Sequence, residues 1–348
     1  MTNNNNISNH YESHTSTSYE SAFFYSEKEY TTWLCNLVRD AFGIPPCGDD
    51  KLVVDGGTTR CGCNSDKHYS DDNALATDDD SGRKRKKRIL LDVGGGTGNF
   101  TSMVISGVDT MEGVVVDPFL PASSSTASTF CNDNQGKKQR LKFVKASAEE
   151  FIPSGHKLHT LNIDEKKEDD VIPWWKTGYN HVLLKEVVHH FDANERVGIF
   201  TGIRNGLIKN NKHGMDESID GSEGAEEERT PSQLLVITRP QIDIDYPMWS
   251  AAKDVWATNQ PSANDIVSDL RKAGFQDVQQ CIKSYPCEIE LNRWLDMVRN
   301  RFWSTFSHFT DEEIEEGCER IMKEVQQPDG EEVMIKFDER LVFITARK

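Results

Sequence analysis

Residues 89–100 read "ILLDVGGGTGNF" and contain the pattern that decides the fold. An apolar run ends at Asp92, and glycines follow at positions 94, 95, 96 and 98. Glycine adopts positive φ at no steric cost and lets a ligand approach the backbone closely. A helix that begins directly after such a loop presents free N–H groups that suit an anionic group. The stretch therefore predicts a buried strand, a ligand-binding loop and a helix, in that order.

The spacing of these glycines excludes two common phosphate-binding motifs. A dinucleotide fingerprint, G-x-G-x-x-G, that starts at Gly94 needs a third glycine where this chain has Asn99. A P-loop needs Lys and then Ser or Thr after its second glycine, whereas Gly98 is followed by Asn99 and Phe100. The pattern that fits is D-x-G-x-G-x-G, which is formed by Asp92, Gly94, Gly96 and Gly98.

Short apolar runs rich in β-branched residues recur along the chain and predict further strands. These runs lie at 88–93, 113–117, 141–146, 181–187, 233–240 and 340–346. A further strand-like segment lies at 277–283. Stripes of apolar residues at helical spacing predict helices between and around them, at 26–42, 262–274, 291–306 and 310–325. Strands that alternate with helices indicate an α/β fold with a mostly parallel sheet.

Composition shifts divide the chain into four parts. Residues 1–18 are predicted to be a disordered tail, 19–45 a helix that packs on the core, and 46–86 a low-complexity insert. Residues 87–348 form the main domain, in which a helical excursion at about 288–328 is predicted to act as a lid. Further polar inserts, which read as long loops, lie at 121–139, 153–177 and 209–232.

Charge and cysteine content limit the possible partners and compartment. The formal net charge of −17 argues against nucleic-acid and anionic membrane surfaces, apart from a basic run at 83–88. No segment approaches the roughly 20 apolar residues that a membrane span needs. The eight cysteines are irregularly spaced, and the polar start of the chain is unlike a secretion signal. These features predict free thiols, no metal site and a cytoplasmic location.

The glycine loop resembles the first motif of class I S-adenosylmethionine-dependent methyltransferases, and later segments extend the resemblance. The strand "GVVVD" ends in Asp117, 19 residues after Gly98. "FVKASAEEF" (143–151) is similar to the third motif of the family, and "YNHVLLKEVVHHF" (179–191) to the fourth. The resemblance covers roughly 85–290 and 341–348. It implies a Rossmann-like, seven-stranded, mostly parallel sheet with helices on both faces, and S-adenosyl-L-methionine as cofactor.

The resemblance also implies which residues hold this cofactor. Asp117 is expected to bond the ribose hydroxyls, Pro118 to pack on adenine, and Ser147 to accept a hydrogen bond from the adenine amino group. The family usually has an acidic residue where this chain has Ser147, which can also cap a helix with Glu150 at its N3 position. The full predicted cofactor set is Asp92, Gly94, Gly95, Gly96, Gly98, Asp117, Pro118, Ser147, Ala148 and Lys185.

Candidate catalytic residues and Arg239 follow from the strand ends, where open α/β sheets bind their ligands. The other substrate candidates come from the aromatic, arginine-bearing lid region and from the segment before the sheet. Glu186, His189 and His190 end the fourth motif and are the catalytic candidates. Adjacent histidines point in different directions in a strand or a helix, so they are poorly placed to share a metal. Two interpretations stay open: either histidine is a general base or an acceptor-orienting group, or both pack at a strand-to-helix junction. The predicted substrate residues are Tyr25, Arg239, Trp249 and Arg301.

The sequence therefore predicts a methyltransferase that acts on a small molecule. The acceptor is expected to be a small carboxylic acid methylated at sulfur, oxygen or nitrogen, and a thioether acceptor needs no base. Two alternatives remain open. The chain could methylate a protein or a tRNA, with residues 83–88 as a docking patch, or it could be a non-catalytic regulatory module that binds the cofactor.

Overall fold

The computed structural model describes residues 28–46, 87–108, 110–120, 129–132, 138–152, 178–208, 231–325 and 333–348. The predicted tail at 1–18 and Tyr25 lie outside these residues, as does most of each predicted insert. The described ranges contain the glycine loop, all the predicted strands and the helical segment before the last strand.

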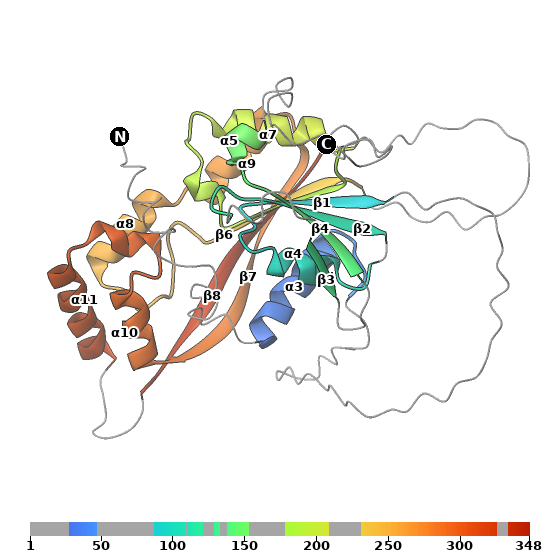
Figure 1. Cartoon of the computed structure of the whole chain (residues 1–348). Helices are drawn as coiled ribbons and strands as arrows, with labels where there is room; N and C mark the ends of the chain where they lie inside the picture. Colours follow the sequence, from blue (N-terminus) through green and yellow to red (C-terminus); the bar gives the residue numbers. More distant parts are fainter. Residues whose placement is uncertain are drawn as a thin grey trace, which may run out of the picture.

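A single mixed sheet forms the centre of the described molecule (Figure 1). Its strand order is β3-β4-β2-β1-β5-β6-β8-β7. Strands β4, β2, β1, β5 and β6 run parallel, whereas β8 is antiparallel to both of its neighbours and β3 is antiparallel to β4. The strands are β1 (Arg88–Val93), β2 (Met111–Val116), β3 (Thr129–Asn132), β4 (Lys138–Val144), β5 (His181–Lys185), β6 (Gln233–Thr238), β7 (Gln276–Glu290) and β8 (Met334–Arg347).

The predicted seven-stranded, mostly parallel α/β sheet is confirmed, with one addition. Edge strand β3 is an eighth strand, and it lies in the segment 121–139 that was expected to be an insert. Strands β7 and β8 are also longer than predicted, at 15 and 14 residues. Only the last part of β8, from Val342 to Arg347, pairs with β6, so the first part forms a two-stranded ribbon with β7.

Helices cover both faces of the sheet, as the alternation of side chains along each strand requires. In β5, Leu183 packs in the apolar cluster that contains residues of α3 (Lys28–Ala41) and α4 (Asn99–Ile105). Its neighbours Val182 and Leu184 point to the other cluster. That cluster contains residues of α5 (Ala148–Phe151), α7 (Arg196–Gly206) and α9 (Ala263–Lys272). The result is a three-layer sandwich (Figure 1).

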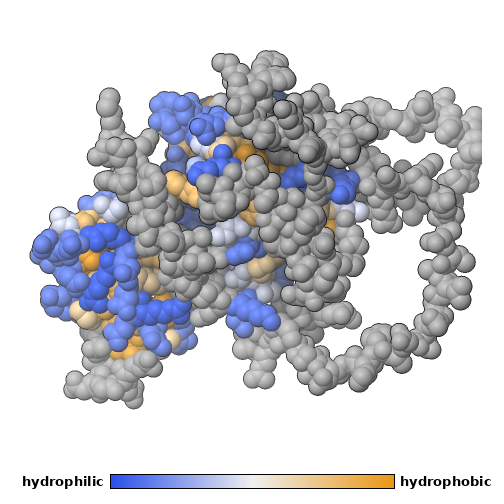
Figure 2. Space-filling model, viewed as in Figure 1, coloured by the Kyte–Doolittle hydropathy of each residue, from blue (hydrophilic) through white to orange (hydrophobic). Residues whose placement is uncertain are grey.

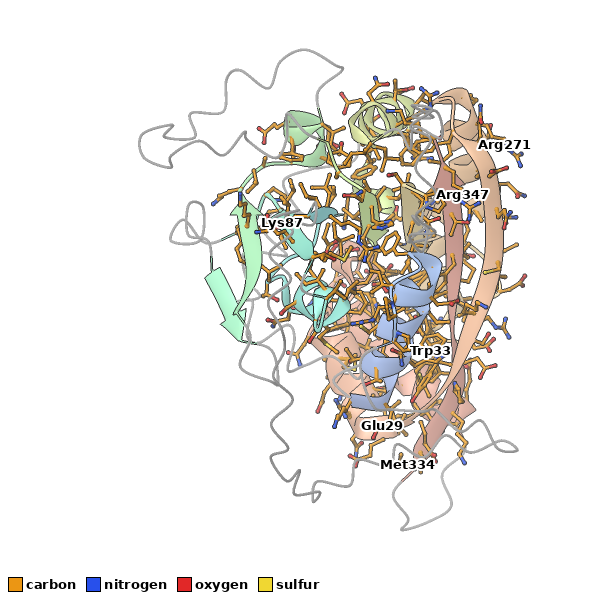
Figure 3. The ribbon with its side chains drawn as sticks, turned by 90° about the vertical axis from the view of Figure 1, so that its right-hand side faces the viewer. Glu29, Trp33, Lys87, Arg271, Met334 and Arg347 are labelled. Carbon is orange, nitrogen blue, oxygen red and sulfur yellow. The ribbon has the colours of Figure 1, made fainter. Side chains whose placement is uncertain are left out.

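Helix α3 joins the N-terminal part of the chain to the sheet. Its buried stripe includes Tyr30, Leu34 and Val38, at the spacing of one helical face. Trp33 lies against Tyr285 of β7, with ring centroids 5.1 Å apart, and is labelled in Figure 3. At the other end of the helix, buried Arg39 donates to carbonyl oxygens of α4 and the residue that follows it. These contacts fix α3 over the same face as α4.

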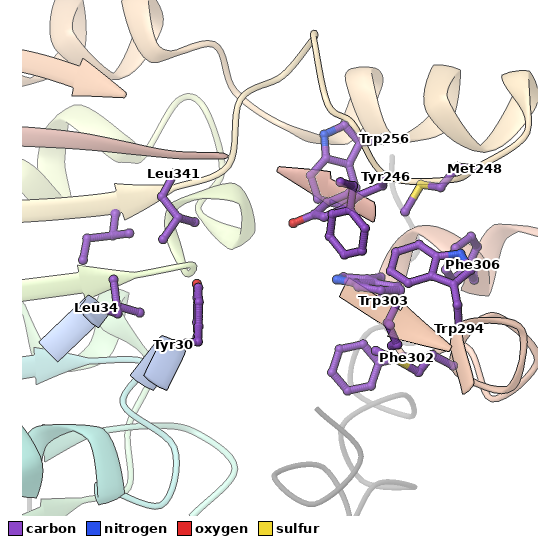
Figure 4. Packing of buried hydrophobic residues seen from close by; sticks show 14 of the residues in the cluster. Tyr30, Leu34, Tyr246, Met248, Trp256, Trp294, Phe302, Trp303, Phe306 and Leu341 are labelled. Carbon is purple, nitrogen blue, oxygen red and sulfur yellow. The ribbon is translucent and has the colours of Figure 1, made fainter. Parts of the chain in front are cut away.

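Four helical segments form a lobe beside the sheet, called the helical lobe below. They are α8 (Ser250–Asn259), α10 (Leu291–Arg299), the 3₁₀ helix η5 (Ser304–His308) and α11 (Asp311–Glu324). Aromatic rings fill its interior, and Trp294 and Trp303 have centroids 5.0 Å apart (Figure 4). Hydrophilic residues cover most of the outward face of the lobe (Figure 2). Whether the lobe moves as a lid stays a prediction.

The prediction of one helix over 291–306 was wrong. Helix α10 ends at Arg299, and Arg301 takes a left-handed backbone conformation with φ of 50° before η5 begins. Helix α8 was not predicted, because its short sequence buries only Ala252 and Trp256. No helix formed by the described residues is both long and apolar enough to span a membrane.

Candidate active site

The glycine loop connects the end of β1 to the start of α4. Gly94, Gly96 and Gly98 all have positive φ, at 76°, 54° and 77°. A Cβ on Gly94 would lie 2.7 Å from Val187, and one on Gly98 would lie 2.8 Å from the Phe143 ring. A Cβ on Gly96 would meet nothing within 4 Å. The loop is therefore packed on both sides and open at Gly96.

Asp117, the residue after β2, accepts a hydrogen bond from this open part of the loop. Its Oδ2 accepts a hydrogen bond from the Gly96 N–H at 3.0 Å, and its Oδ1 accepts one from Phe119 N at 2.8 Å. Burial raises the pKa of the Asp117 carboxyl, and these two hydrogen bonds oppose the rise. Pro118 is exposed beside it. The structure thus brings Asp117 to the predicted position next to the loop.

Asp92 supports the loop from beneath. Its side chain is buried, and Oδ2 accepts a hydrogen bond from Thr101 at 2.5 Å. Burial raises the pKa of this carboxyl to about 6. A Cβ on Gly95 would lie 2.6 Å from the same oxygen, so glycine at 95 allows the loop to sit on the carboxylate. Asp92 therefore supports the loop, and its Oδ1 is buried without a hydrogen-bond partner among the described residues. Its contact with the cofactor stays a prediction.

Ser147 caps the short helix α5. Its hydroxyl accepts a hydrogen bond from Glu150 N at 3.2 Å, and the Glu150 carboxylate accepts one from Ser147 N at 2.9 Å. The predicted capping box is therefore confirmed. Ala148 is buried in the cluster on that face of the sheet. Contact of either residue with adenine stays a prediction.

The chain turns sharply after β5. Glu186 has a φ of 56°, which is uncommon for a residue other than glycine, and its N–H donates to Ile237 O of β6 at 2.7 Å. The Nζ of Lys185, the last residue of β5, lies 5.4 Å from the centre of the Phe100 ring. These contacts place the end of β5 between the glycine loop and the end of β6.

The two histidines form part of the 3₁₀ helix η4 (Val188–His190). Their ring centroids lie 3.9 Å apart. The pKa of His189 is held well below its ordinary value, first by burial and then by the neighbouring His190 and Arg239. His189 is therefore neutral at pH 7, and the same lowering makes its imidazole a weaker base. Within the described ranges, no group of three or more His, Cys, Asp or Glu residues is placed to hold a metal ion.

Arg239 stands at the centre of an ion-pair network after β6. Its Nη1 donates to the Glu186 carboxylate, and its Nε lies 3.0 Å from Glu339 Oε1 and 2.6 Å from the Tyr246 hydroxyl. Tyr246 in turn donates to Glu339. We call Glu186, Arg239, Tyr246 and Glu339 the Arg239 network. Two carboxylates bind Arg239 in this structure, and its predicted role in capturing a substrate carboxylate stays a prediction.

The charges of the Arg239 network shift the pKa values of Glu186 and of Tyr30 on α3. Burial alone would raise the pKa of Glu186, but Arg239 and Lys185 hold it below its ordinary value. The pKa of Tyr30 on α3 is raised well above its ordinary value, first by burial and then by Glu339 and Glu186. Glu186 is therefore a carboxylate at neutral pH, and Tyr30 keeps its proton.

Two predicted substrate residues have other partners. Trp249 is 5% exposed and stacks on Phe306 in the helical lobe, with ring centroids 5.6 Å apart. Arg301 donates to Asp311 at 2.8 Å and to Phe309 O at 3.1 Å, which joins the end of α10 to the start of α11. The Trp249 ring is part of the core of the lobe, and its contact with a substrate stays a prediction.

Sequence reasoning missed Glu339, although the sequence contains a signal for it. Inward-facing residues of β8 alternate along the chain and are apolar at Ile335, Phe337 and Leu341. Glu339 occupies an inward position in the same series and has no exposed surface. A charged residue at a core position of an otherwise alternating strand indicates a buried polar contact.

Solved structures similar to this chain include several methyltransferases. One is a candidate methyltransferase from Bacillus halodurans, at 14% identity and a TM-score of 0.41, which spans 76% of this chain and 94% of that one. A second is a candidate methyltransferase from an antibiotic biosynthesis pathway of Anabaena variabilis. It has 11% identity and a TM-score of 0.40, over 74% of this chain and 90% of that one.

A third similar structure is phosphoethanolamine N-methyltransferase 2 of Haemonchus contortus, in complex with S-adenosyl-L-methionine. It has 12% identity and a TM-score of 0.35, over 77% of this chain and 50% of that one. No sequence model of a protein family and no curated protein matches the chain. Residue roles in this chain therefore rest on its own geometry.

Proposed function

We propose that this chain is an S-adenosylmethionine-dependent methyltransferase that acts on a small-molecule acceptor. The observation that carries the proposal is the open backbone at Gly96, with the Asp117 carboxylate bonded to its N–H. An acidic residue at the end of the second strand of a Rossmann-like fold suits ribose hydroxyls. The backbone at Gly96 is open beside that residue, so the residues present fit this cofactor.

The charges around the strand ends also suit a cationic cofactor. Asp117, Glu186 and Glu339 are carboxylates there, whereas Lys185 and Arg239 are the cations, and Asp92 lies directly below the loop. When bound, S-adenosylmethionine supplies a methyl group on a positively charged sulfur, which an acceptor displaces in line. Asp117 would hold the ribose, and Pro118 would cover the adenine.

His189 is the proposed base for acceptors that lose a proton. Burial keeps its imidazole neutral, and it lies next to the Arg239 network at the end of β5. A positioned base of this kind contributes most when the acceptor is a hydroxyl or an amine. We retain sulfur, oxygen and nitrogen as acceptor atoms. Arg239 does not support the preference for a carboxylic acid, because its guanidinium is already paired.

Calorimetry with S-adenosylmethionine tests the cofactor, and absence of binding would overturn the proposal. A screen for transfer of a tritiated methyl group to small carboxylic acids, thioethers and amines tests the acceptor. Label in a protein or tRNA fraction would favour the macromolecular alternative. Binding without transfer to any acceptor would favour the regulatory alternative.

Replacing Gly96 by alanine is expected to weaken binding of S-adenosylmethionine by about 5- to 150-fold, the range that corresponds to overpacking costs of about 1–3 kcal/mol. The new methyl group would enter the open side of the loop, where the cofactor is proposed to lie. Calorimetry on the folded variant measures the change.

Gly107→Ala is the matched control for this variant. Gly107 also has a positive φ, of 71°, and open space around its Cβ position, but it follows α4 at the end away from the loop. Both substitutions should lower stability by a similar amount, about 1–2 kcal/mol. Only Gly96→Ala should lower affinity, and equal affinities in the two variants would show that the cofactor does not lie over Gly96.

A further inference from the structure

Stability alone does not explain why Glu339 is buried. Replacing a buried ion pair by apolar residues of similar volume is often neutral or stabilising. The inward neighbours of Glu339 on β8 are Ile335, Phe337 and Leu341, so an apolar residue at 339 would continue the core. Glu339 has no exposed surface and binds Arg239. The position is better explained by what Arg239 holds.

Arg239 holds Glu186, which is constrained at both ends. The backbone of Glu186 has a left-handed φ of 56° and donates to Ile237 O. Strained residues of this kind are concentrated at functional sites. The side chain of Glu186 is 18% exposed, against 0% for Glu339. Glu186 is thus the carboxylate of the network that a ligand can reach.

The turn at Glu186 and the Asp117 carboxylate lie at opposite ends of the glycine loop. Strand β1 lies between β2, which ends before Asp117, and β5, which ends before Glu186. Val187 is in contact with the loop at Gly94, whereas Asp117 bonds Gly96 from the other side. A nucleoside with its ribose at Asp117 that crosses the loop therefore extends towards Glu186.

We propose that Glu339 is a positioning residue. Through Arg239 it holds the Glu186 carboxylate in place to bind the ammonium group at the amino-acid end of S-adenosylmethionine. Two carboxylates share one guanidinium, so the network keeps negative charge that a ligand cation can neutralise. This inference rests on the proposed function, because it assigns one end of the same cofactor.

Two probes separate the amino-acid end from the rest of the cofactor. S-adenosylhomocysteine carries the ammonium and carboxylate, whereas 5′-methylthioadenosine has the adenine, ribose and thioether without them. In calorimetry, Glu339→Gln is expected to weaken S-adenosylhomocysteine binding by roughly 10- to 100-fold, the range for one charged hydrogen bond. Affinity for 5′-methylthioadenosine should stay unchanged. An equal loss for both ligands, or a loss for neither, would overturn the inference.

A double-mutant cycle tests whether Glu339 acts through Glu186. Glu186→Gln alone should give a similar selective loss, and the double variant should lose no more than either single variant. Additive losses would overturn the inference. Glu288→Gln makes the same chemical change on the exposed partner strand, where Glu288 pairs with Lys336, and should alter neither affinity.

Thermal unfolding of each variant shows whether the fold is kept. If Glu339→Gln does not fold, Tyr246→Phe removes the hydroxyl that contacts both Arg239 and Glu339 and keeps the aromatic packing. It should weaken S-adenosylhomocysteine binding in the same selective way, and unchanged binding would overturn the inference. Failure of the wild-type chain to bind either ligand would instead overturn the proposed function, and this inference with it.

Discussion

Replacing His189 by alanine is expected to lower the rate of methyl transfer to a hydroxyl or amine acceptor by about 100- to 10,000-fold, the usual contribution of a positioned base. Burial, His190 and Arg239 keep the imidazole neutral at pH 7, which is the form that a general base requires. Transfer of tritium from labelled S-adenosylmethionine to the acceptor identified by the screen measures the rate. The cofactor affinity of the variant should match that of the wild type.

The pH dependence provides a second measurement on the same residue. A general base works only when it is deprotonated, and the pKa of His189 lies well below its ordinary value. The acidic fall in rate should therefore lie below pH 6.5, the ordinary histidine pKa. His190→Ala is the comparison variant, and a larger loss of rate there would transfer the role to His190. Unchanged rates in both variants would leave the two histidines as packing residues.

Acid is expected to destabilise the fold through His181 by about 3 kcal/mol between pH 6.5 and pH 4. The His181 ring has no exposed surface and packs on Phe42, with ring centroids 4.8 Å apart. Neither of its nitrogens has a hydrogen-bond partner among the described residues. Burial, and then the charge of Arg88, lower its pKa to about 3.

The direction of the His181 effect follows from this lowered pKa. Above pH 6.5 the imidazole is neutral in both states, and its contribution to stability is complete. As the pH falls towards 3, the unfolded chain binds a proton that the folded chain does not, so stability is lost. Asp92 acts in the opposite direction between pH 6 and 3.8, because its folded pKa is raised and the folded state binds the proton first.

Comparison of the wild type with His181→Leu removes the Asp92 contribution from the measurement. Urea unfolding at a series of pH values gives the free energy of unfolding of each protein. The stability advantage of His181→Leu should grow by about 3 kcal/mol from pH 6.5 to pH 4. A difference that stays constant with pH would show that His181 gains a proton equally in both states.

The parts of the fold that follow local patterns could be predicted from the sequence. Buried parallel strands are short runs of β-branched residues, so β1, β5 and β6 could be placed within a few residues. The glycine loop was also accessible, because its positive φ values at 94, 96 and 98 require glycine.

Other features depend on contacts that local patterns do not contain. Helix α10 ends shortly before Arg301, which has a left-handed backbone conformation. The sequence has no glycine or proline there that would predict this end. The Arg239 network joins Arg239 to Glu339, which lies 100 residues further along the chain. Their meeting depends on the pairing of β8 with β6, which the sequence does not specify by itself. For this reason the sequence did not predict that Arg239 pairs with Glu339 and Glu186.

Strand β8 runs from the two-stranded ribbon into the central sheet. From Val342 onwards it is hydrogen-bonded on both sides, by β6 and β7, but before that point only β7 pairs with it. Amide hydrogen exchange should therefore divide this one strand into a slow segment at 342–347 and a faster one at 334–341. A movement of the lobe would then bend the two-stranded ribbon, and Glu339 lies in this ribbon three residues before β6 begins to pair with β8.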